Sequence, residues 1–264
     1  MNLLSLPRNI LWVGFFLVVL AAWAAMYSMA VEMDLNLIGQ TGPRGDAMRM
    51  MAPGMNMRMP MAEYGPLFAM WAIMMAAMML PSMVPALKTY EALMVGANAS
   101  WGGWTGVLIG YGSMWVFFAA IAAAMQLALL HGGVVDMLGM LKSTTVSGML
   151  LIAVGAFQFS RIKQICHGVC QAPMTYYLGA WKPGFSGGVG MGLGLGKYCV
   201  FCCWGIMALG FAGGVMNLLW MGLATVFMVL EKLPQIGSRV MRPAGTLLII
   251  GGMAAIAIPL LNGG

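Results

Sequence analysis

Residues 106–130 read GVLIGYGSMWVFFAAIAAAMQLALL, an uninterrupted run without a charged side chain. A helix needs about 20 predominantly apolar residues to cross a bilayer, and this run is long enough. Backbone polar groups in lipid must bond within their own segment, so the run should be helical. Comparable apolar runs occupy residues 10–31, 66–87, 146–159, 187–211, 215–230 and 245–261. The sequence therefore predicts an all-α fold, a polytopic transmembrane helical bundle of about seven spans.

The composition of the whole chain supports this fold class. Of the 264 residues, 61% are hydrophobic and only 8% are charged. A soluble domain carries about 25% charged residues. The net charge is +6, but the basic residues are scattered at the ends of apolar runs. Because nucleic-acid binding needs a gathered basic patch, this distribution argues against that class of protein.

The Lys and Arg residues between the apolar runs predict the orientation, because cytoplasmic loops carry an excess of them. With the N-terminus inside, eight fall on the inner side and four on the outer side. The inner set is Arg8, Lys88, Arg161, Lys163, Lys182, Lys232, Arg239 and Arg242, and the outer set is Arg44, Arg49, Arg58 and Lys142. We therefore expect a multi-pass protein of a bacterial inner membrane, with a cytoplasmic N-terminus and a periplasmic C-terminus. Residues 1–65 would form the first helix plus an outer loop, and residues 66–264 the helical bundle.

That outer loop is rich in methionine. Seven fall close together, at Met48, Met50, Met51, Met55, Met57, Met59 and Met61. Thioethers are soft ligands that select Cu(I), so the loop could collect copper. Methionine also fills irregular gaps in apolar packing, and the loop could instead lie over the helices.

A second group of methionines lies in the span at residues 66–87. Met70, Met74 and Met78 recur every fourth residue and therefore share one face of a helix. This stripe has two interpretations, a path for a soft metal ion or helix packing. Pro81 and Pro85 should kink or end the helix.

The first of two cysteine motifs follows the fourth span. Cys166, His167 and Cys170 lie within five residues of one another in a predicted cytoplasmic loop. Two thiols and an imidazole can share one soft metal ion. The alternative is a pair of reduced thiols without a role.

The second motif lies inside the fifth span. Cys199, Cys203 and Met207 are four residues apart and share a helical face, with Cys202 beside it. These side chains could bind a soft metal ion or simply fill small gaps between helices. The many glycines at residues 184–196 indicate either close packing of this helix against a neighbour or a broken helix at the start of the span.

Ionisable residues accompany the second motif. Lys197 precedes Cys199 within the span, and an ionisable residue inside a membrane is costly and points to function. We expect Lys197 to offset the negative charge of thiolates around Cu(I). Glu231 and Lys232 follow the sixth span, where their side chains are expected to reach the membrane interface.

Several stretches carry a family resemblance. They read MMAAMMLPS at residues 74–82, CHGVCQAP at 166–173, GKYCVFCCWGIM at 196–207 and GVMNLLWM at 214–221, followed by the Glu231–Lys232 pair. In this order they resemble a bacterial family of predicted metal-binding integral membrane proteins, a domain of unknown function (number 2182). Two residues depart from the pattern: His167 lies between the paired cysteines, and Phe201 stands where a Gly is expected. Both departures leave the cysteines intact. The resemblance implies metal binding in the membrane and no established reaction.

These features favour an integral membrane metal-binding protein that handles Cu(I), by transport or by delivery to a copper-dependent membrane enzyme. The metal candidates are Cys199, Cys202, Cys203, Met207, Cys166, His167, Cys170, Met70, Met74 and Met78. A metal-dependent membrane enzyme subunit is one alternative, but catalytic metals usually take more His or carboxylate ligands. The chain has only two histidines, and no catalytic residue or organic cofactor is predicted. A non-catalytic accessory subunit of a larger membrane complex is another alternative. The expected partners are the lipid bilayer and such an enzyme or complex.

Overall fold

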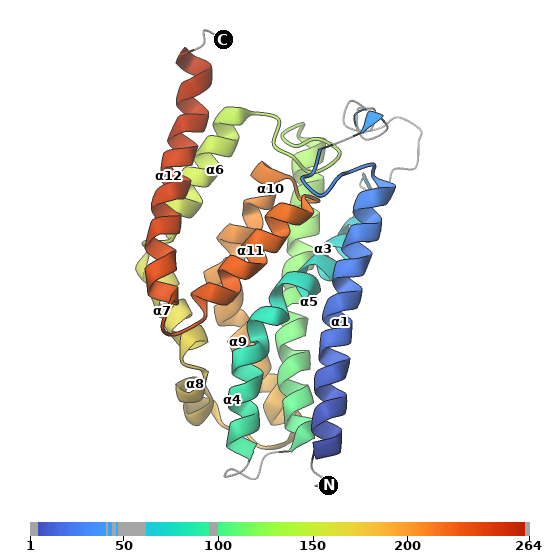
Figure 1. Ribbon diagram of the computed structural model, residues 1–264, viewed down its shortest axis with the longest axis vertical. Helices are drawn as coiled ribbons and strands as arrows, with labels where there is room; N and C mark the ends of the chain where they lie inside the picture. The colour runs from blue at the N-terminus through green and yellow to red at the C-terminus, as the bar shows by residue number, and fades with distance from the viewer. Residues whose placement is uncertain (1–4, 41, 44–45, 47–61, 95–99, 262–264) are drawn as a thin grey trace.

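A computed structural model of the chain describes residues 5–40, 42–43, 46, 62–94 and 100–261 (Figure 1). Helices make up most of these ranges, and no strand is assigned in them, which confirms the all-α class. The methionine tract at residues 48–61 lies outside the described residues. In chain order the helices are α1 (Ser5–Glu32), α3 (Tyr64–Met79), the 3-10 helix η2 (Pro81–Met83), α4 (Val84–Met94), α5 (Trp101–His131), α6 (Thr144–Phe157), α7 (Arg161–Gln171), α8 (Pro173–Ala180), α9 (Gly184–Ala208), α10 (Gly210–Gly213), α11 (Leu218–Glu231) and α12 (Gly237–Leu261).

The boundaries of several helices follow from short polar residues that cap them. The side chains of Ser100, Ser143, Ser160 and Asn217 each accept a hydrogen bond from a backbone N–H in the first turn of α5, α6, α7 and α11. Such caps satisfy a donor that would otherwise have no partner at the helix start. The predicted break at the prolines is also present, because α3 ends at Met79 and η2 begins at Pro81.

The seven predicted spans are not confirmed by the lengths and compositions of the described helices. Among the described residues, five helices are long and apolar enough by length and composition, namely Arg8–Glu32, Tyr64–Met94, Trp101–His131, Gly184–Gly213 and Arg239–Pro259. A sixth results if the pair Thr144–Phe157 and Arg161–Gln171, bent by 62°, counts as one span. The apolar run predicted at residues 215–230 becomes α11, which has 14 residues. At 1.5 Å per residue it covers only about 21 Å, less than the hydrocarbon core of a bilayer.

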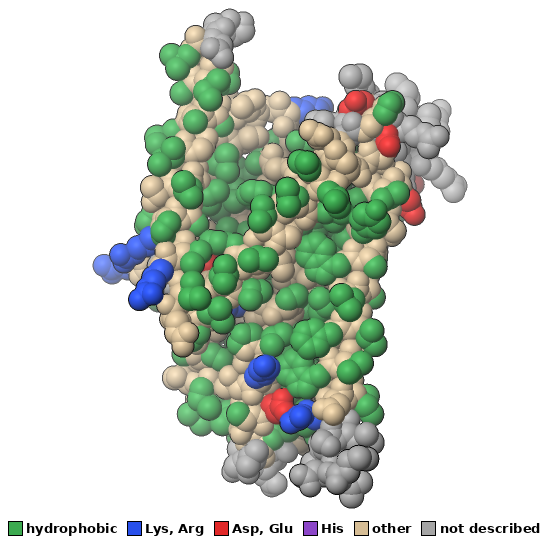
Figure 2. All heavy atoms as spheres, viewed as in Figure 1, with side chains coloured by type: hydrophobic (Ala, Val, Ile, Leu, Met, Phe, Trp, Pro, Cys, Tyr) green, Lys and Arg blue, Asp and Glu red, His purple; other side chains and the backbone are tan. Residues whose placement is uncertain are grey.

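Although it is short, α11 still reverses the direction of the chain. Figure 1 shows that α1 begins at one end of the molecule and α12 ends at the other. In Figure 2 hydrophobic side chains cover the middle of the visible face, and most charged side chains lie toward its two ends or at one edge. Large apolar side chains such as Leu17, Leu20 and Leu247 are more than half exposed. This surface is compatible with association with a membrane.

Close approach of α5 and α9 holds the centre of the bundle together. A Cβ atom added to Gly192 on α9 would lie 2.9 Å from the backbone nitrogen of Tyr111 on α5 and would also meet the carbonyl oxygen of Val107. A Cβ on Gly110 would lie 2.9 Å from the backbone nitrogen of Leu193. Only glycine permits this backbone contact, so the close packing expected from the glycines at 184–196 is confirmed. The contact fixes Tyr111 next to the part of α9 that carries the cysteines.

Replacing Gly192 with alanine is expected to lower the free energy of unfolding by about 1–3 kcal/mol, because the added methyl collides with backbone that has no rotamer to adjust. The matched control is Gly190→Ala on the same helix, where an added Cβ meets nothing within 4 Å. That control should be neutral or slightly stabilising, since alanine favours helix over glycine. Thermal unfolding of the detergent-solubilised chains measures both, and equal midpoints for the two variants would contradict the backbone contact.

Candidate metal centre

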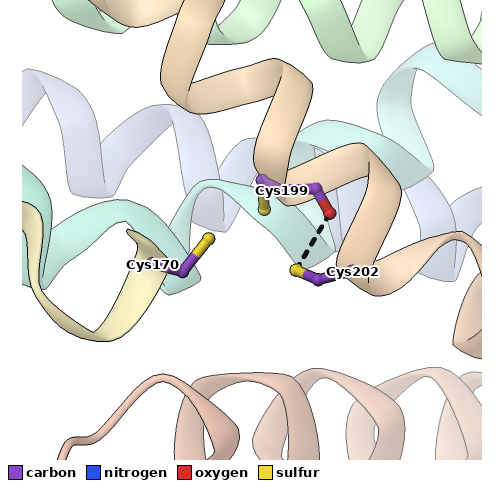
Figure 3. A group of neighbouring side chains, drawn as sticks. All are labelled: Cys170, Cys199 and Cys202. Atoms are coloured by element: carbon purple, nitrogen blue, oxygen red, sulfur yellow. Dashed lines mark hydrogen bonds between the residues drawn. The ribbon is translucent and has the colours of Figure 1, made fainter. Parts of the chain in front are cut away.

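Three thiols from two helices meet inside the bundle. Cys199 and Cys202 lie on α9 and Cys170 on α7, and all three side chains are buried. Their Sγ atoms lie within 4.8 Å of one another. Figure 3 shows the Cys170 side chain directed from its own helix toward the two on α9, with the Cys202 thiol donating to the Cys199 carbonyl oxygen at 3.2 Å. We call Cys170, Cys199 and Cys202 the thiol cluster.

A fourth thiol adjoins this cluster. The Sγ of Cys203 lies 3.2 Å from the Sγ of Cys202, and Cys203 is buried as well. All five cysteines are free thiols. Cys166 is buried on α7 but is not part of the thiol cluster. The structure therefore joins the two sequence motifs through Cys170, while Cys166 stands apart.

A lysine contacts the thiol cluster directly. The Lys232 ammonium donates to the Cys199 Sγ at 2.9 Å and to the Ser82 hydroxyl at 2.6 Å. The Tyr111 hydroxyl lies 3.1 Å from the same sulfur. The Ser82 hydroxyl in turn donates to the Met79 carbonyl oxygen at 2.8 Å. Two polar groups, the Lys232 ammonium and the Tyr111 hydroxyl, therefore contact the Cys199 sulfur, and the ammonium favours a negatively charged sulfur.

These contacts correct two expectations about charged residues. Lys232 is 5% exposed and Glu231 is 1% exposed, so the pair does not reach an interface. The reason is that the short α11 ends inside the bundle, against α7 and η2, and directs both side chains inward. Lys197, expected to offset thiolate charge, is exposed instead. It lies on the outward face of α9, and Lys232 takes the position expected for it.

A buried ion pair lies at the end of α11, next to Lys232. The Lys163 ammonium donates to Glu231 Oε1 at 2.8 Å, and both side chains are almost fully buried. The Gln171 amide donates to the Glu231 carbonyl oxygen at 3.0 Å and lies 3.0 Å from His167 Nε2. The pair therefore ties the end of α11 to α7, the helix that carries Cys170. His167 belongs to this polar network and not to the thiol cluster.

Three of the methionine candidates gather around a cavity of their own. Met70, Met74, Met78 and Met207 are all buried. Met74, Met78 and Met207 line one small cavity together with Met221, whereas Met70 does not line it. The stripe predicted on α3 is therefore split by the structure.

Four residues of the site were missed by the sequence reasoning. Tyr111 and Ser82 had no assigned role, and Lys163 and Lys232 were counted only as topology signals or interfacial residues. Ser82 did carry a signal, because it closes the MMLPS part of a quoted motif. Tyr111 carried none, since its place depends on the glycine contact between α5 and α9.

The donor set fits a soft monovalent cation. Thiolates are soft ligands, and Cu(I) is among the metals that they select. One Cu(I) with three thiolates would carry a charge of −2, and the Lys232 ammonium beside Cys199 would reduce the local sum to −1. Buried charge is tolerated only where it is paired and hydrogen-bonded, and this site offers both. The thiol cluster therefore has the chemistry needed to hold copper in a buried setting.

Comparison with known proteins agrees with this chemistry. No curated protein and no solved structure matches the chain. A family model described as the copper chaperone PpoB2 matches residues 68–255, which is more than half of the chain and includes every member of the thiol cluster and Lys232. The match shows a copper-related family, which supports the copper predicted from the cysteine and methionine residues. The chain belongs to the PpoB2 family of copper chaperones.

Proposed function

We propose that this protein is an integral membrane copper chaperone that holds Cu(I) at Cys170, Cys199 and Cys202 and delivers it to a copper-dependent partner. The observation that carries the proposal is the meeting of three buried thiols with the Lys232 ammonium. The description of the family favours delivery over transport. The copper ion is the cargo, and the chain supplies ligands and charge balance.

The membrane location rests on the apolar helices. Five or six of them suit a bilayer by length and composition. The opposite positions of the start of α1 and the end of α12 support an odd number of passes (Figure 1). This agrees with a cytoplasmic N-terminus and a periplasmic C-terminus in a bacterial inner membrane. Lys163 and Lys232 are buried in the bundle, but the other six Lys and Arg residues assigned to the inner side still outnumber the four assigned to the outer side, which supports the same orientation.

The residues around the thiol cluster suggest how copper leaves it. Cys203, in contact with Cys202, offers a further thiolate for ligand exchange. A polar cavity of about 730 Å³ lies beside the Lys163–Glu231 network and is lined by His167, Gln171, Arg239 and Arg242 among others. His167 lines this cavity and precedes Cys170 by about one helical turn on α7.

The kinetics of copper removal test the delivery function. We expect the Cu(I)-loaded chain in detergent to surrender copper to bathocuproine disulfonate at a rate that rises with the concentration of this chelator. Such a dependence means that the acceptor enters the coordination sphere before copper leaves. A rate independent of chelator concentration would mean simple dissociation and would contradict a chaperone mechanism.

Liposomes separate delivery from transport. The chain is reconstituted into liposomes that enclose the same chelator, and Cu(I) is added outside. A chaperone should give no faster internal colour than protein-free liposomes, because its copper leaves only by contact with an acceptor. Internal accumulation well above that background, lost in the Cys199→Ala variant, would overturn delivery in favour of transport.

A further inference from the structure

A second soft-ligand cavity lies in the bundle. It is about 10 Å³ in volume and is lined by the side chains of Met74 and Met78 from α3, Met207 from α9 and Met221 from α11. Each of these methionines is 2% or 3% exposed. Trp220 lines another side of it. We call this space the methionine cavity.

The chemistry of its walls favours a soft cation over water. About 10–15 Å³ is the space that one water needs, and a buried water also needs two to four polar partners. The side chains of the lining residues are thioether, aliphatic or aromatic, and among them only that of Trp220 carries a polar hydrogen. Thioether sulfurs bind Cu(I) and not hard cations, and an indole face attracts a cation. A single Cu(I) matches both the size and the ligands of the cavity.

The methionine cavity is placed next to the thiol cluster. Met207 follows Cys203 by four residues on α9, a rise of about 6 Å on the same helical face. On the other wall of the cavity, Met78 lies four residues before Ser82. The Ser82 hydroxyl accepts a hydrogen bond from the Lys232 ammonium. Two helices therefore lead from the cavity to the cluster. The cavity lies on the side of the cluster toward α10 and the start of α11.

We propose that Met74, Met78, Met207 and Met221 form a second Cu(I) site, a thioether site that exchanges copper with the thiol cluster. The inference deepens the proposed function and rests on it. Neutral thioethers leave the charge of the ion uncompensated, whereas the thiolates of the cluster balance it, so the cluster binds more tightly. The methionine cavity therefore holds copper in transit and fills second.

Silver(I) is the probe for this site, because it shares the ligand preference of Cu(I) and is not oxidised in air. The full chain is labelled with ¹³C at the methionine methyl groups and titrated with Ag(I) in detergent. After the first equivalent, the methyl signals of the four cavity methionines should shift. Those of Met75 on α3 and Met26 on α1, which are buried but do not line the cavity, should stay in place. Unmoved cavity signals at saturating Ag(I) would overturn the proposal and leave these methionines as packing residues.

A second measurement on the same samples distinguishes failure of the thioether site from failure of the proposed function. Thiolate-to-silver absorption in the near ultraviolet reports the thiol cluster alone. Absorption without methyl shifts would contradict only the thioether site, and methyl shifts without absorption would contradict only copper binding at the thiol cluster.

A pair of variants gives a second test of the cavity. The double variant Met74→Leu with Met221→Leu should lower the bound Ag(I) by one equivalent. Met75→Leu, matched in size and helix, should leave it unchanged, and an equal loss in both variants would contradict a site at the cavity.

Discussion

Replacing Cys199 with alanine is expected to lower the Cu(I) affinity of the purified chain by about 100-fold or more. Loss of a residue that merely supports a metal ligand costs about 10- to 100-fold in affinity, and Cys199 is itself a candidate ligand. It is also the sulfur that accepts from Lys232 and contacts Tyr111. Without it, a buried ammonium faces the two remaining thiols with no anion to pair with. Competition with a Cu(I) chelator measures the affinity directly.

The matched control for this variant is Cys166→Ala. Cys166 is also a buried thiol, but it is not part of the thiol cluster. We expect it to keep the full affinity and the same unfolding midpoint. If Cys199→Ala binds copper as tightly as Cys166→Ala does, the thiol cluster is not a copper site. The Cys170→Ala variant should resemble Cys199→Ala, because its thiol completes the group from a separate helix.

The part of this site on α9 was predictable from spacing alone. Cys199, Cys202 and Cys203 share one region of a helix wherever that helix lies, because the period of 3.6 residues fixes it. The contribution of Cys170 was not predictable in this way. It depends on the cap at Ser160, which starts a new helix after α6, and on the 62° bend between the two helices. Hydropathy carries no information about either.

The misplaced lysines show a related limit. An apolar run followed by Glu231 and Lys232 is typical of a helix that ends at a membrane surface. Because α11 is only 14 residues long, the same pattern here ends inside the protein. Hydropathy reports how apolar a segment is but not how deep its ends lie. The expectation for Lys197 was wrong for the opposite reason. Its helix lies at the centre of the bundle, but its side chain points outward from the protein.

The ion pair between Lys163 and Glu231 should dominate the stability of this region. Replacing Lys163 with methionine leaves the Glu231 carboxylate buried without its cation, and removal of one partner of a buried pair costs about 3–5 kcal/mol. The double variant Lys163→Met with Glu231→Gln removes both charges and should recover most of that loss. Unfolding of the three chains in detergent, read as a double-mutant cycle, gives the coupling between the two residues.

An exposed ion pair of the same chain supplies the comparison. Arg8 and Glu91 lie 3.8 Å apart, with side chains 51% and 25% exposed. Arg8→Met should cost no more than about 1 kcal/mol, because water already screens such a pair. A similar cost for Arg8→Met and Lys163→Met would show that the inner pair is also hydrated and would contradict its burial.

The same cycle separates stability from copper binding. The Lys163–Glu231 pair ties α11 to α7, and these helices carry Lys232 and Cys170 to the thiol cluster. In the double variant the hydrogen bond from Gln171 to the Glu231 backbone still joins the two helices, because it does not depend on the side chain. We therefore expect the double variant to regain copper affinity together with stability. Regained stability with copper affinity still lost would mean that the Glu231 carboxylate itself acts on the metal site, beyond its role in positioning the two helices.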